Sequence, residues 1–497
     1  MVARSSCWGS RWSLPRTAGI TERTPSRAAG QSEGYDPPGT ETDAARTTLT
    51  WSDSLHILPP VDQQNVQVRR GDRQLMADMN RNLVLHALRN RGRASRADIA
   101  RDTGLSATTV SGMTAALIDS GLVVEVGPGK LDRGRPPVVL ELDSSRNYVI
   151  GVRLMSDSII VVVTDLHGKV LYRDSGPLPG GLPPVVPGSP EAPDGTVFIE
   201  PSPVLAAICA AVRSSIRRAK VNRTKVLGVG IGIGGVFDGG VCLYSPIFGW
   251  ENVAVAAPLS KRLGYPVLVE NDVKTLAVAE LWFGHGRGVD NFLVVIAGRG
   301  VGIGIVVNGA LYRGSDGAAG EFGHVTVPGI TARCRCGRIG CLEAATADYA
   351  VLREAVDDAG PESPLLKLPR EGITLEAVRE AAEAGDPSSI RALTQAGSAL
   401  GLALAAIANV LNPRLLIITG EGLAAGPLRL DAMRESLGHA LVRGIGARLR
   451  IVTEPVDEFI WARGAACAMI GELFRPPIQS GRESLSESSR KELSNVI

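Results

Sequence analysis

The chain has 497 residues, enough for two or three domains with sizeable cores, so a single small module is excluded. Its 53 Lys and Arg residues nearly balance its 51 Asp and Glu residues, so any contact with nucleic acid must come from local placement of basic residues rather than from net charge. The composition, 44% hydrophobic and 21% charged with 58 Gly, excludes a fibrous or wholly disordered chain and favours an α/β protein rich in turns.

No membrane or export segment is apparent. The longest apolar run, residues 399–411, is shorter than the ~20 residues that span a bilayer and contains Asn409, so we expect a buried Ala-rich helix. Arg residues interrupt every apolar stretch near the N-terminus, which argues against a signal peptide. We therefore expect a cytoplasmic protein.

Three irregular segments frame and interrupt the ordered chain. Residues 1–70 are rich in Ser, Thr, Arg, Gly and Pro without strand or helix periodicity, which predicts a disordered tail. A start of translation near Met76 or Met79 is the alternative. The Pro-rich stretch at residues 176–203 predicts a surface loop, and the Ser/Glu/Lys-rich residues 475–497 predict a flexible tail.

The first ordered segment, residues 71–145, has the pattern of a helix-turn-helix. Apolar residues recur at helical spacing over residues 80–92 and predict a first helix. Ser95 is placed to cap a second helix over residues 96–103, and Gly104 can make the turn that follows.

A third helix, predicted over residues 107–120 with Ser106 as its cap, has the position of a recognition helix. Its expected buried face consists of Val110, Met113, Ala116 and Leu117. The other face offers small polar groups that could approach bases and phosphates in a major groove. The candidate DNA contacts on this helix are Ser106, Thr108, Thr109 and Ser111.

Residues 121–126 and 138–142 are predicted to form the two strands of a wing. The tip between them carries Arg133 and Arg135, whose side chains could enter a narrow minor groove. Because the module is near neutral, the DNA-binding hypothesis depends on geometry. The alternative is a packing or dimerisation domain with an arginine-bearing loop.

Residues 146–474 alternate β-branched runs with Ala/Leu/Glu helical patterns, which is typical of an α/β domain. The predicted strands are residues 148–152, 159–164, 226–233, 267–270, 292–296 and 415–419.

Two glycine-rich segments could bring the backbone close to a ligand. Residues 230–235 contain a formal G-x-G-x-x-G, but residues 236–240 predict a turn and a strand. A dinucleotide site needs a helix there, so we reject this site. Residues 298–304 could cradle a phosphate or let two parts of the chain pack closely.

A group of three Cys residues and one His residue predicts a metal site. Three thiolates and an imidazole suffice for a closed tetrahedral Zn²⁺ site, which would be structural; an unmetallated thiol cluster is the alternative. The candidate ligands are His324, Cys334, Cys336 and Cys341. Glu321 and Glu343 flank them, so a bound metal would fix both carboxylates, which suggests a ligand rich in hydroxyls.

The strand at residues 267–270 runs into Asn271 and Asp272 at its carboxyl end, where α/β proteins place ligand-binding groups. Asp272 could act as a general base toward a hydroxyl, as a hydrogen-bond acceptor, or only as part of a helix cap. The residues alone leave these roles open.

In their order, these motifs resemble those of the ROK family (repressors, open reading frames and sugar kinases) over roughly residues 80–473. The motifs are the winged helix, Glu270-Asn-Asp272, Gly320-Glu-Phe-Gly-His324 and Cys334-Arg-Cys-Gly-Arg-Ile-Gly-Cys-Leu-Glu343. The resemblance implies a two-lobed actin-like ATPase fold of the ribonuclease H-like class, a sugar cleft between the lobes, homodimers or homotetramers, and operator DNA as a partner. It also implies sugar contacts at Asn271, Asp272, Glu321, His324 and Glu343, with His324 also on Zn²⁺. In the kinases of the family, Asp272 would be the base.

The sequence departs from the family's kinases in the phosphate-binding motifs. Where they carry Asp-x-Gly-Gly-Thr, this chain has Arg153-Leu-Met-Ser-Asp157, and where Gly-Thr-Gly is usual it has Gly298-Arg-Gly300. We expect Met155 to block the backbone approach that a phosphate needs, so nucleotide binding should fail. Ile247 stands where an Asn often follows Ser-Pro in the sugar lobe, which changes one expected hydroxyl contact.

These observations predict a sugar-responsive transcriptional regulator, a repressor of carbohydrate genes, that is not an enzyme. A sugar in the cleft would shift lobe closure and thereby the affinity for operator DNA. One alternative is an ATP-dependent ROK sugar kinase that carries the DNA module as an accessory. Another is a scaffold that answers to a protein partner and binds no sugar.

Overall fold

The computed structural model describes residues 73–128, 137–179, 198–369, 372–455 and 457–474. The tails predicted at residues 1–70 and 475–497 lie outside these ranges, as do Arg133 and Arg135 at the predicted wing tip.

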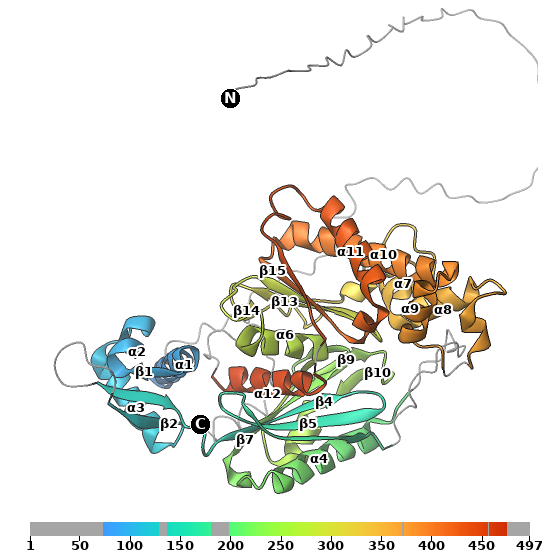
Figure 1. Ribbon diagram of the computed structural model, residues 1–497. Coiled ribbons are helices and arrows are strands. Elements are labelled where there is room, and N and C mark those ends of the chain that lie inside the picture. The colour runs from blue at the N-terminus through green and yellow to red at the C-terminus, as the bar shows by residue number, and fades with distance from the viewer. Residues whose placement is uncertain (1–72, 129–136, 180–197, 370–371, 456, 475–497) are drawn as a thin grey trace, which may run out of the picture. The chain divides into compact units, whose positions relative to one another are not determined.

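The N-terminal segment contains three helices and a small antiparallel sheet with strand order β1-β3-β2 (Figure 1). The helices are α1 (Arg73–Arg91), α2 (Arg96–Thr103) and α3 (Ala107–Asp119), and the strands are β1 (Arg93–Ser95), β2 (Val123–Pro128) and β3 (Val138–Leu142). The prediction missed β1, which is too short to show a period of two. The predicted first helix also begins too late, at residue 80 instead of Arg73. The buried apolar residues of α1 start at Val84, so the turns before it carry no periodic apolar signal.

The predicted caps of α2 are confirmed. The Ser95 hydroxyl accepts a hydrogen bond from the Asp98 backbone N–H, and the Asp98 carboxylate accepts one from the Ser95 backbone N–H, which is a reciprocal capping box. Gly104 ends the helix with φ of 70°, a left-handed conformation that glycine adopts without strain.

The buried face of α3 differs from its prediction at one position. Val110 and Leu117 are buried as expected and Met113 is half-buried, but Ala116 is exposed. Thr114 takes its place in the core because its hydroxyl donates to the Val110 carbonyl oxygen (2.8 Å), which satisfies the polar group internally.

Two five-stranded sheets form the rest of the ordered chain, with strand orders β11-β7-β4-β5-β6 and β14-β13-β12-β15-β16. The first contains β4 (Tyr148–Leu154), β5 (Ser158–Asp165), β6 (Val170–Pro177), β7 (Val226–Ile233) and β11 (Val267–Asn271). The second contains β12 (Phe292–Ala297), β13 (Val301–Val307), β14 (Ala310–Leu311), β15 (Leu415–Thr419) and β16 (Arg450–Thr453). A small sheet of β8 (Val236–Asp238), β9 (Val241–Ser245) and β10 (Trp250–Ala254) adjoins the first. All six predicted strands are present.

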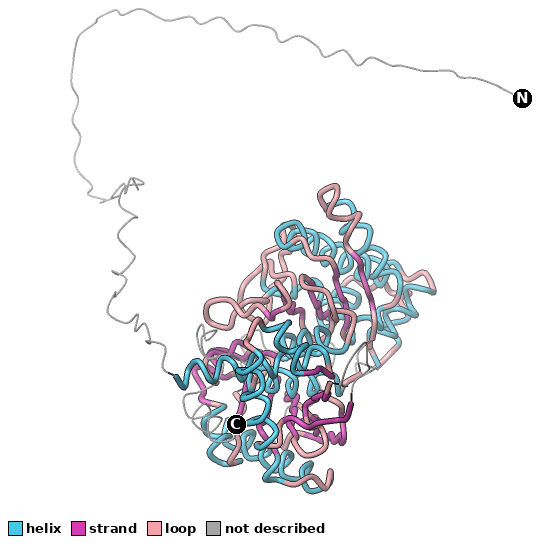
Figure 2. The backbone as a smooth tube through the Cα atoms, turned by 90° about the vertical axis from the view of Figure 1, so that its left-hand side faces the viewer, coloured by secondary structure: helices cyan, strands magenta, loops and turns pink. Residues whose placement is uncertain are grey.

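The two sheets are the cores of two lobes, and helices α6 (Asp272–Phe283) and α12 (Phe459–Leu473) lie between them (Figures 1 and 2). Glycines allow these layers to approach closely. A Cβ on Gly151 of β4 would lie 1.8 Å from the Ala462 carbonyl oxygen of α12, and one on Gly304 of β13 would lie 2.6 Å from Cβ of Ala277 in α6. Gly464 lets α12 meet α6 in the same way. This is the α/β fold of two lobes that the resemblance implied.

The remaining helices are α4 (Pro201–Arg218), α5 (Ala256–Leu263), α7 (Glu343–Thr346), α8 (Asp348–Asp357), α9 (Leu375–Glu383), α10 (Pro387–Leu411) and α11 (Pro427–Ala440). Of these helices, α4 and α5 pack on the first sheet, α10 and α11 pack on the second, and α7, α8 and α9 pack against α10. Short 3₁₀ turns occur at Arg223–Lys225, Phe322–His324, Pro364–Lys367 and Glu421–Ala425.

The apolar run predicted to be a buried helix is the second half of α10. Among the described residues, α10 is the one helix long and apolar enough to cross a membrane, and half of its most apolar window is buried inside the protein. Gly397 and Gly401 bring it against α11, since Cβ atoms there would lie 2.2 Å and 2.3 Å from the carbonyl oxygens of Arg429 and Met433. These contacts are those of a core helix.

The predicted bounds of the surface loop, residues 176–203, are wrong because an ordered element overlaps each end. Strand β6 continues through Pro177, and α4 begins at Pro201. Proline is tolerated on an edge strand and in the first turn of a helix, so its presence did not exclude either element. The rejection of a dinucleotide site is supported, because β7 leads into strand β8 and not into a helix.

Candidate functional site

Asn271 and Asp272 lie at the junction of β11 and α6, on the edge of the first sheet where its parallel strands end. Asn271 caps α6: its Oδ1 accepts a hydrogen bond from the Lys274 backbone N–H (3.2 Å), and its Nδ2 donates to the Gly235 carbonyl oxygen (2.9 Å). Both side-chain groups of Asn271 are therefore fixed by the backbone. Asp272 begins the helix and remains partly exposed.

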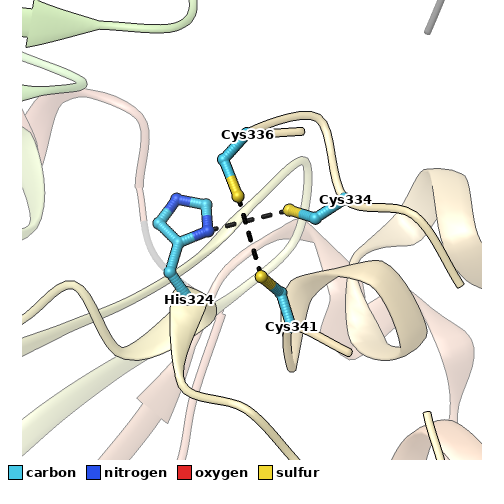
Figure 3. Close-up of side chains that lie close together, drawn as sticks. All are labelled: His324, Cys334, Cys336 and Cys341. Atoms are coloured by element: carbon cyan, nitrogen blue, oxygen red, sulfur yellow. Dashed lines mark hydrogen bonds between the residues drawn. The ribbon is translucent and has the colours of Figure 1, made fainter. Parts of the chain in front are cut away.

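The four predicted metal ligands converge (Figure 3). Their donor atoms all lie within 4.8 Å of one another. The Cys336 and Cys341 Sγ atoms are 3.7 Å apart, as are Cys334 Sγ and His324 Nδ1. A disulfide needs ~2.05 Å, whereas two thiolates on a tetrahedral metal with bonds of ~2.3 Å lie ~3.8 Å apart. The donor set and its spacing thus fit a four-coordinate metal ion.

Glu321 and Glu343 flank this cluster, and electrostatic interactions link Glu321 to Asp272 across the site. Burial raises the pKa of Glu321, and the charges of Glu343 and Asp272 raise it further, while His324 and Lys274 oppose them. Glu343 Oε2 accepts a hydrogen bond from the Val301 backbone N–H (3.1 Å). Glu321 of the second lobe thus interacts electrostatically with His324 and Glu343, and with Asp272 of the first lobe.

Arg153 and Trp461 form a second feature of the same region. Arg153 ends β4 and is only 7% exposed, and its guanidinium carbon lies 3.8 Å from the ring centroid of Trp461 in α12. Its Nε has no hydrogen-bond partner in the described part of the chain. Burial raises the pKa of Asp272, and the positive charge of Arg153 opposes that rise.

An ion pair connects the two segments that were compared with kinase phosphate loops. Arg299, between β12 and β13, donates to Asp157, between β4 and β5, with Nη1 and Oδ2 3.1 Å apart. The two strands preceding these residues belong to different sheets, so the pair joins the lobes.

Sequence reasoning missed two buried charged groups beside the site and the partly buried Arg313 that pairs with one of them. Glu270 and Lys274 are 4% and 2% exposed, and Arg313 Nε lies 2.6 Å from Glu270 Oε2. The available signal was the position of Lys274, a charged residue one turn into a helix that is otherwise largely apolar.

The predicted DNA-contacting residues of α3 fall into two groups. Thr108 and Ser111 are exposed near the start of the helix. Ser106 and Thr109 are engaged in the cap, where the Ser106 hydroxyl accepts from the Thr109 backbone N–H (3.1 Å) and lies 2.8 Å from the Thr109 hydroxyl.

Known proteins share both parts of this chain. Residues 200–471 match the ROK family, and residues 83–127 match the IclR helix-turn-helix domain. The chain is 28% identical over 412 residues to a xylose repressor of Caldicellulosiruptor bescii, covering 82% of this chain and 99% of that protein. It is 27% identical over 395 residues to the DNA-binding transcriptional dual regulator NagC of Escherichia coli, covering 79% and 92%.

The chain is also similar to solved structures of ROK family proteins. A ROK family transcriptional regulator, a homologue of the E. coli MLC protein, has a TM-score of 0.69 and 25% identity, covering 85% of this chain and all of that one. A ROK family glucokinase from Streptomyces griseus, solved with glucose and AMPPNP, has a TM-score of 0.52 and 29% identity, covering 64% and 98%. With its motifs, its fold and the match over residues 200–471 in agreement, the chain belongs to the ROK family.

Proposed function

We propose that this protein is a transcriptional regulator that binds operator DNA through α2, α3 and the wing, and releases it when a sugar binds between the lobes. The observation that carries the proposal is the presence of both parts in one chain: a capped helix-turn-helix and, in the ROK domain, a convergent cluster of carboxylates beside a four-ligand metal cluster. The matches to the xylose repressor and to the transcriptional dual regulator NagC extend over both parts.

For DNA, we propose that Thr108 and Ser111 contact the major groove directly and that Ser106 and Thr109 act mainly by fixing the helix start. Thr108 and Ser111 are exposed on the helix; Ser106 is exposed as well, but its hydroxyl is already hydrogen-bonded to Thr109 in the cap. Arg133 and Arg135 remain our proposed minor-groove contacts. Reading a two-fold symmetric operator requires a dimer, so we propose a homodimer or a homotetramer.

For the sugar, we propose that Asn271, Asp272, Glu321, His324 and Glu343 form the binding site. Carboxylates accept hydrogen bonds from adjacent hydroxyls, and charge-assisted bonds of this kind are stronger than neutral ones. A ligand with several hydroxyls on one face suits a cluster in which three carboxylates interact electrostatically. We propose Zn²⁺ for the metal, because three thiolates and an imidazole are the donors that it prefers.

We propose that the site does not transfer phosphate. Arg153 places a buried positive charge at the end of β4, and the Asp157–Arg299 pair joins the two segments that would have to receive phosphates. Arg153 stands where the kinases carry an acidic residue, so it cannot hold a metal ion there. Arg299 pairs with the Asp157 carboxylate instead of with a phosphate.

The deciding experiment is fluorescence anisotropy of the full chain on its own upstream DNA, titrated with D-xylose, D-glucose and N-acetylglucosamine. Release of the DNA by one of these sugars supports the proposal. ADP production from ATP and the same sugar would instead support the kinase alternative, which the retained Asp272 and the glucokinase likeness favour. DNA binding that no sugar changes would contradict the effector role of the site.

A further inference from the structure

Three charged residues beside the site, the buried Glu270 and Lys274 and the partly buried Arg313, form one connected group, which we call the charge cluster. Glu270 ends β11 in the first sheet, and Arg313 follows β14 in the second. Their contact at 2.6 Å therefore joins the two lobes, and the Glu270 side chain in it is only 5% exposed. A buried carboxylate such as that of Glu270 is strongly destabilising unless a positive charge and hydrogen bonds compensate it.

Both carboxylate oxygens of Glu270 are engaged. Oε2 accepts from Arg313 Nε, and Oε1 accepts from the Asn271 backbone N–H (3.0 Å). Glu270 thus connects Arg313 directly to the peptide that begins α6 and carries Asn271 and Asp272.

Lys274 makes a second connection between the same two parts of the chain. Its ammonium donates to the Gly317 carbonyl oxygen, which lies in the segment between Arg313 and Glu321. Burial lowers the pKa of Lys274, while Glu270 and Glu321 raise it, so both carboxylates lie close enough to stabilise its charge. Lys274 therefore interacts electrostatically with one residue of the cluster and one residue of the proposed sugar site.

The segment at residues 312–321 lies against both lobes. Gly317 has φ of +77°, and a Cβ there would lie 2.0 Å from the Phe237 carbonyl oxygen of β8, so the segment lies directly on the first lobe. At its far end, a Cβ on Gly320 would lie 2.2 Å from the Ile303 carbonyl oxygen of β13, so it also lies on the second lobe. Glu321 follows this second contact immediately.

We infer that Glu270, Lys274 and Arg313 are positioning residues that hold Glu321 opposite Asn271 and Asp272 and thereby set the affinity for the sugar; this inference rests on the proposed function. Glu270 and Lys274 are almost fully buried, so we expect the cluster to act on the ligand through Asn271, Asp272 and Glu321. Removing Arg313 alone leaves the buried Glu270 carboxylate without its ion-pair partner, whereas the double variant removes that carboxylate charge as well and Lys274 keeps its hydrogen bond to the Gly317 carbonyl oxygen. The affinity of a double variant should therefore exceed that of either single variant.

The test uses the full chain carrying Arg313→Gln, Glu270→Gln, or both changes. Arg434→Gln is the matched control, because Arg434 makes an exposed ion pair with Asp431 (3.1 Å) on α11. Sugar affinity is measured by calorimetry with whichever of D-xylose, D-glucose or N-acetylglucosamine binds the wild type. Metal content and hydrogen–deuterium exchange of residues 312–324 without sugar are measured on the same samples.

Arg313→Gln is expected to weaken sugar binding by at least ~10-fold and to accelerate exchange over residues 312–324, with the double variant recovering most of the loss. Metal content should stay at the wild-type level, which separates a positioning role from general unfolding. Wild-type affinity and exchange in Arg313→Gln, or a double variant as weak as the single ones, overturns the inference. If Arg313→Gln does not fold, Arg313→Lys replaces it: a loss of ~3-fold supports the inference, and wild-type behaviour overturns it.

A wild-type protein that binds none of the three sugars contradicts the proposed function instead. The exchange measurement then decides the role of the cluster by itself, since it requires no ligand. Accelerated exchange in Arg313→Gln supports the positioning of the segment, and unchanged exchange overturns it.

Discussion

At the scale of single residues, burial, a nearby positive charge and a backbone hydrogen bond all act on the carboxylate of Asp272, one of the proposed sugar-binding groups. Burial raises its pKa, and the positive charge of Arg153 is the largest influence in the opposite direction. Its Oδ1 already accepts a hydrogen bond from the Val273 backbone N–H (2.9 Å). The carboxylate is thus held in place by the helix start, with acceptor capacity left for a hydroxyl.

Asp272→Asn should weaken sugar binding by ~10–100-fold, because the charge-assisted bonds to hydroxyls become neutral ones. Operator affinity without sugar should not change. Calorimetry for the sugar and anisotropy for the DNA check the two parts, with Asp174→Asn as control because Asp174 pairs with Arg218 (3.2 Å) on the exposed edge strand β6. A variant that needs no more sugar than the wild type to release DNA would remove Asp272 from the site.

His86 in α1 provides a test of pH dependence. Burial lowers its pKa from 6.5 to about 4, with Arg89 acting in the same direction and a hydrogen bond involving the Phe474 backbone opposing it. Its folded pKa is depressed, so the unfolded chain binds more protons between pH 6.5 and about 4. The free energy of unfolding should therefore fall as the pH decreases through this range.

His86→Gln, which does not titrate, should lose roughly 2 kcal/mol less stability than the wild type between pH 7 and pH 4.5. Urea unfolding at the two pH values checks this, and comparing variant with wild type removes the contribution of acid-sensitive metal ligands. Equal losses in both proteins would show that His86 is not responsible.

At the scale of elements, close helix packing in the second lobe depends on glycines. A Cβ on Gly401 of α10 would lie 2.3 Å from the Met433 carbonyl oxygen and 2.9 Å from the Leu437 backbone nitrogen of α11. Backbone atoms cannot move aside as a flexible side chain can. The sequence alone offers no reason to distinguish this glycine from others in helices.

Gly401→Ala should destabilise the protein by ~1–3 kcal/mol, because the added methyl forces α10 and α11 apart. The matched control is Gly438→Ala in α11, where a Cβ would meet nothing within 4 Å. That change should be neutral or stabilise by up to ~1 kcal/mol through helix propensity. Thermal unfolding of both variants checks the contrast, and a neutral Gly401→Ala would refute the packing argument.

At the scale of the whole molecule, the cluster of His324 and three Cys residues lies next to the two carboxylates that a bound metal is proposed to fix. Cys334 Sγ is 4.0 Å from Glu343 Oε1, and the His324 ring interacts electrostatically with Glu321. Loss of the metal should therefore reach the sugar site directly. The helix-turn-helix helices α1–α3 lie far from these residues in the sequence and make their own caps.

Cys336→Ser should abolish metal binding and the response to sugar while leaving operator affinity intact. Metal analysis, calorimetry and anisotropy measure the three properties, and Cys209→Ser, which removes a thiol outside the cluster, serves as control. Unchanged metal content together with an unchanged sugar response would exclude Cys336 as a ligand.

The sequence by itself determined those features that depend on neighbouring residues. Ser95 and Gly104 bound α2 as predicted, because caps and left-handed turns are local interactions. Strands β7 and β15 have the predicted bounds, since buried strands show as unbroken β-branched or apolar runs. The spacing of Cys334, Cys336 and Cys341 also predicted that these three side chains converge, because a knuckle of this kind is itself local.

Only the tertiary structure decided which distant residues meet. Thr114 lies in the core of α3 in place of Ala116, and its hydroxyl also accepts a hydrogen bond from Arg96 Nε of α2 (3.1 Å). The contact between Glu270 and Arg313 joins residues 43 positions apart on different sheets, and no local pattern predicts such a pairing. Buried charges require partners, so a sequence can show that Lys274 needs one, but only the packing of two lobes shows which groups supply it.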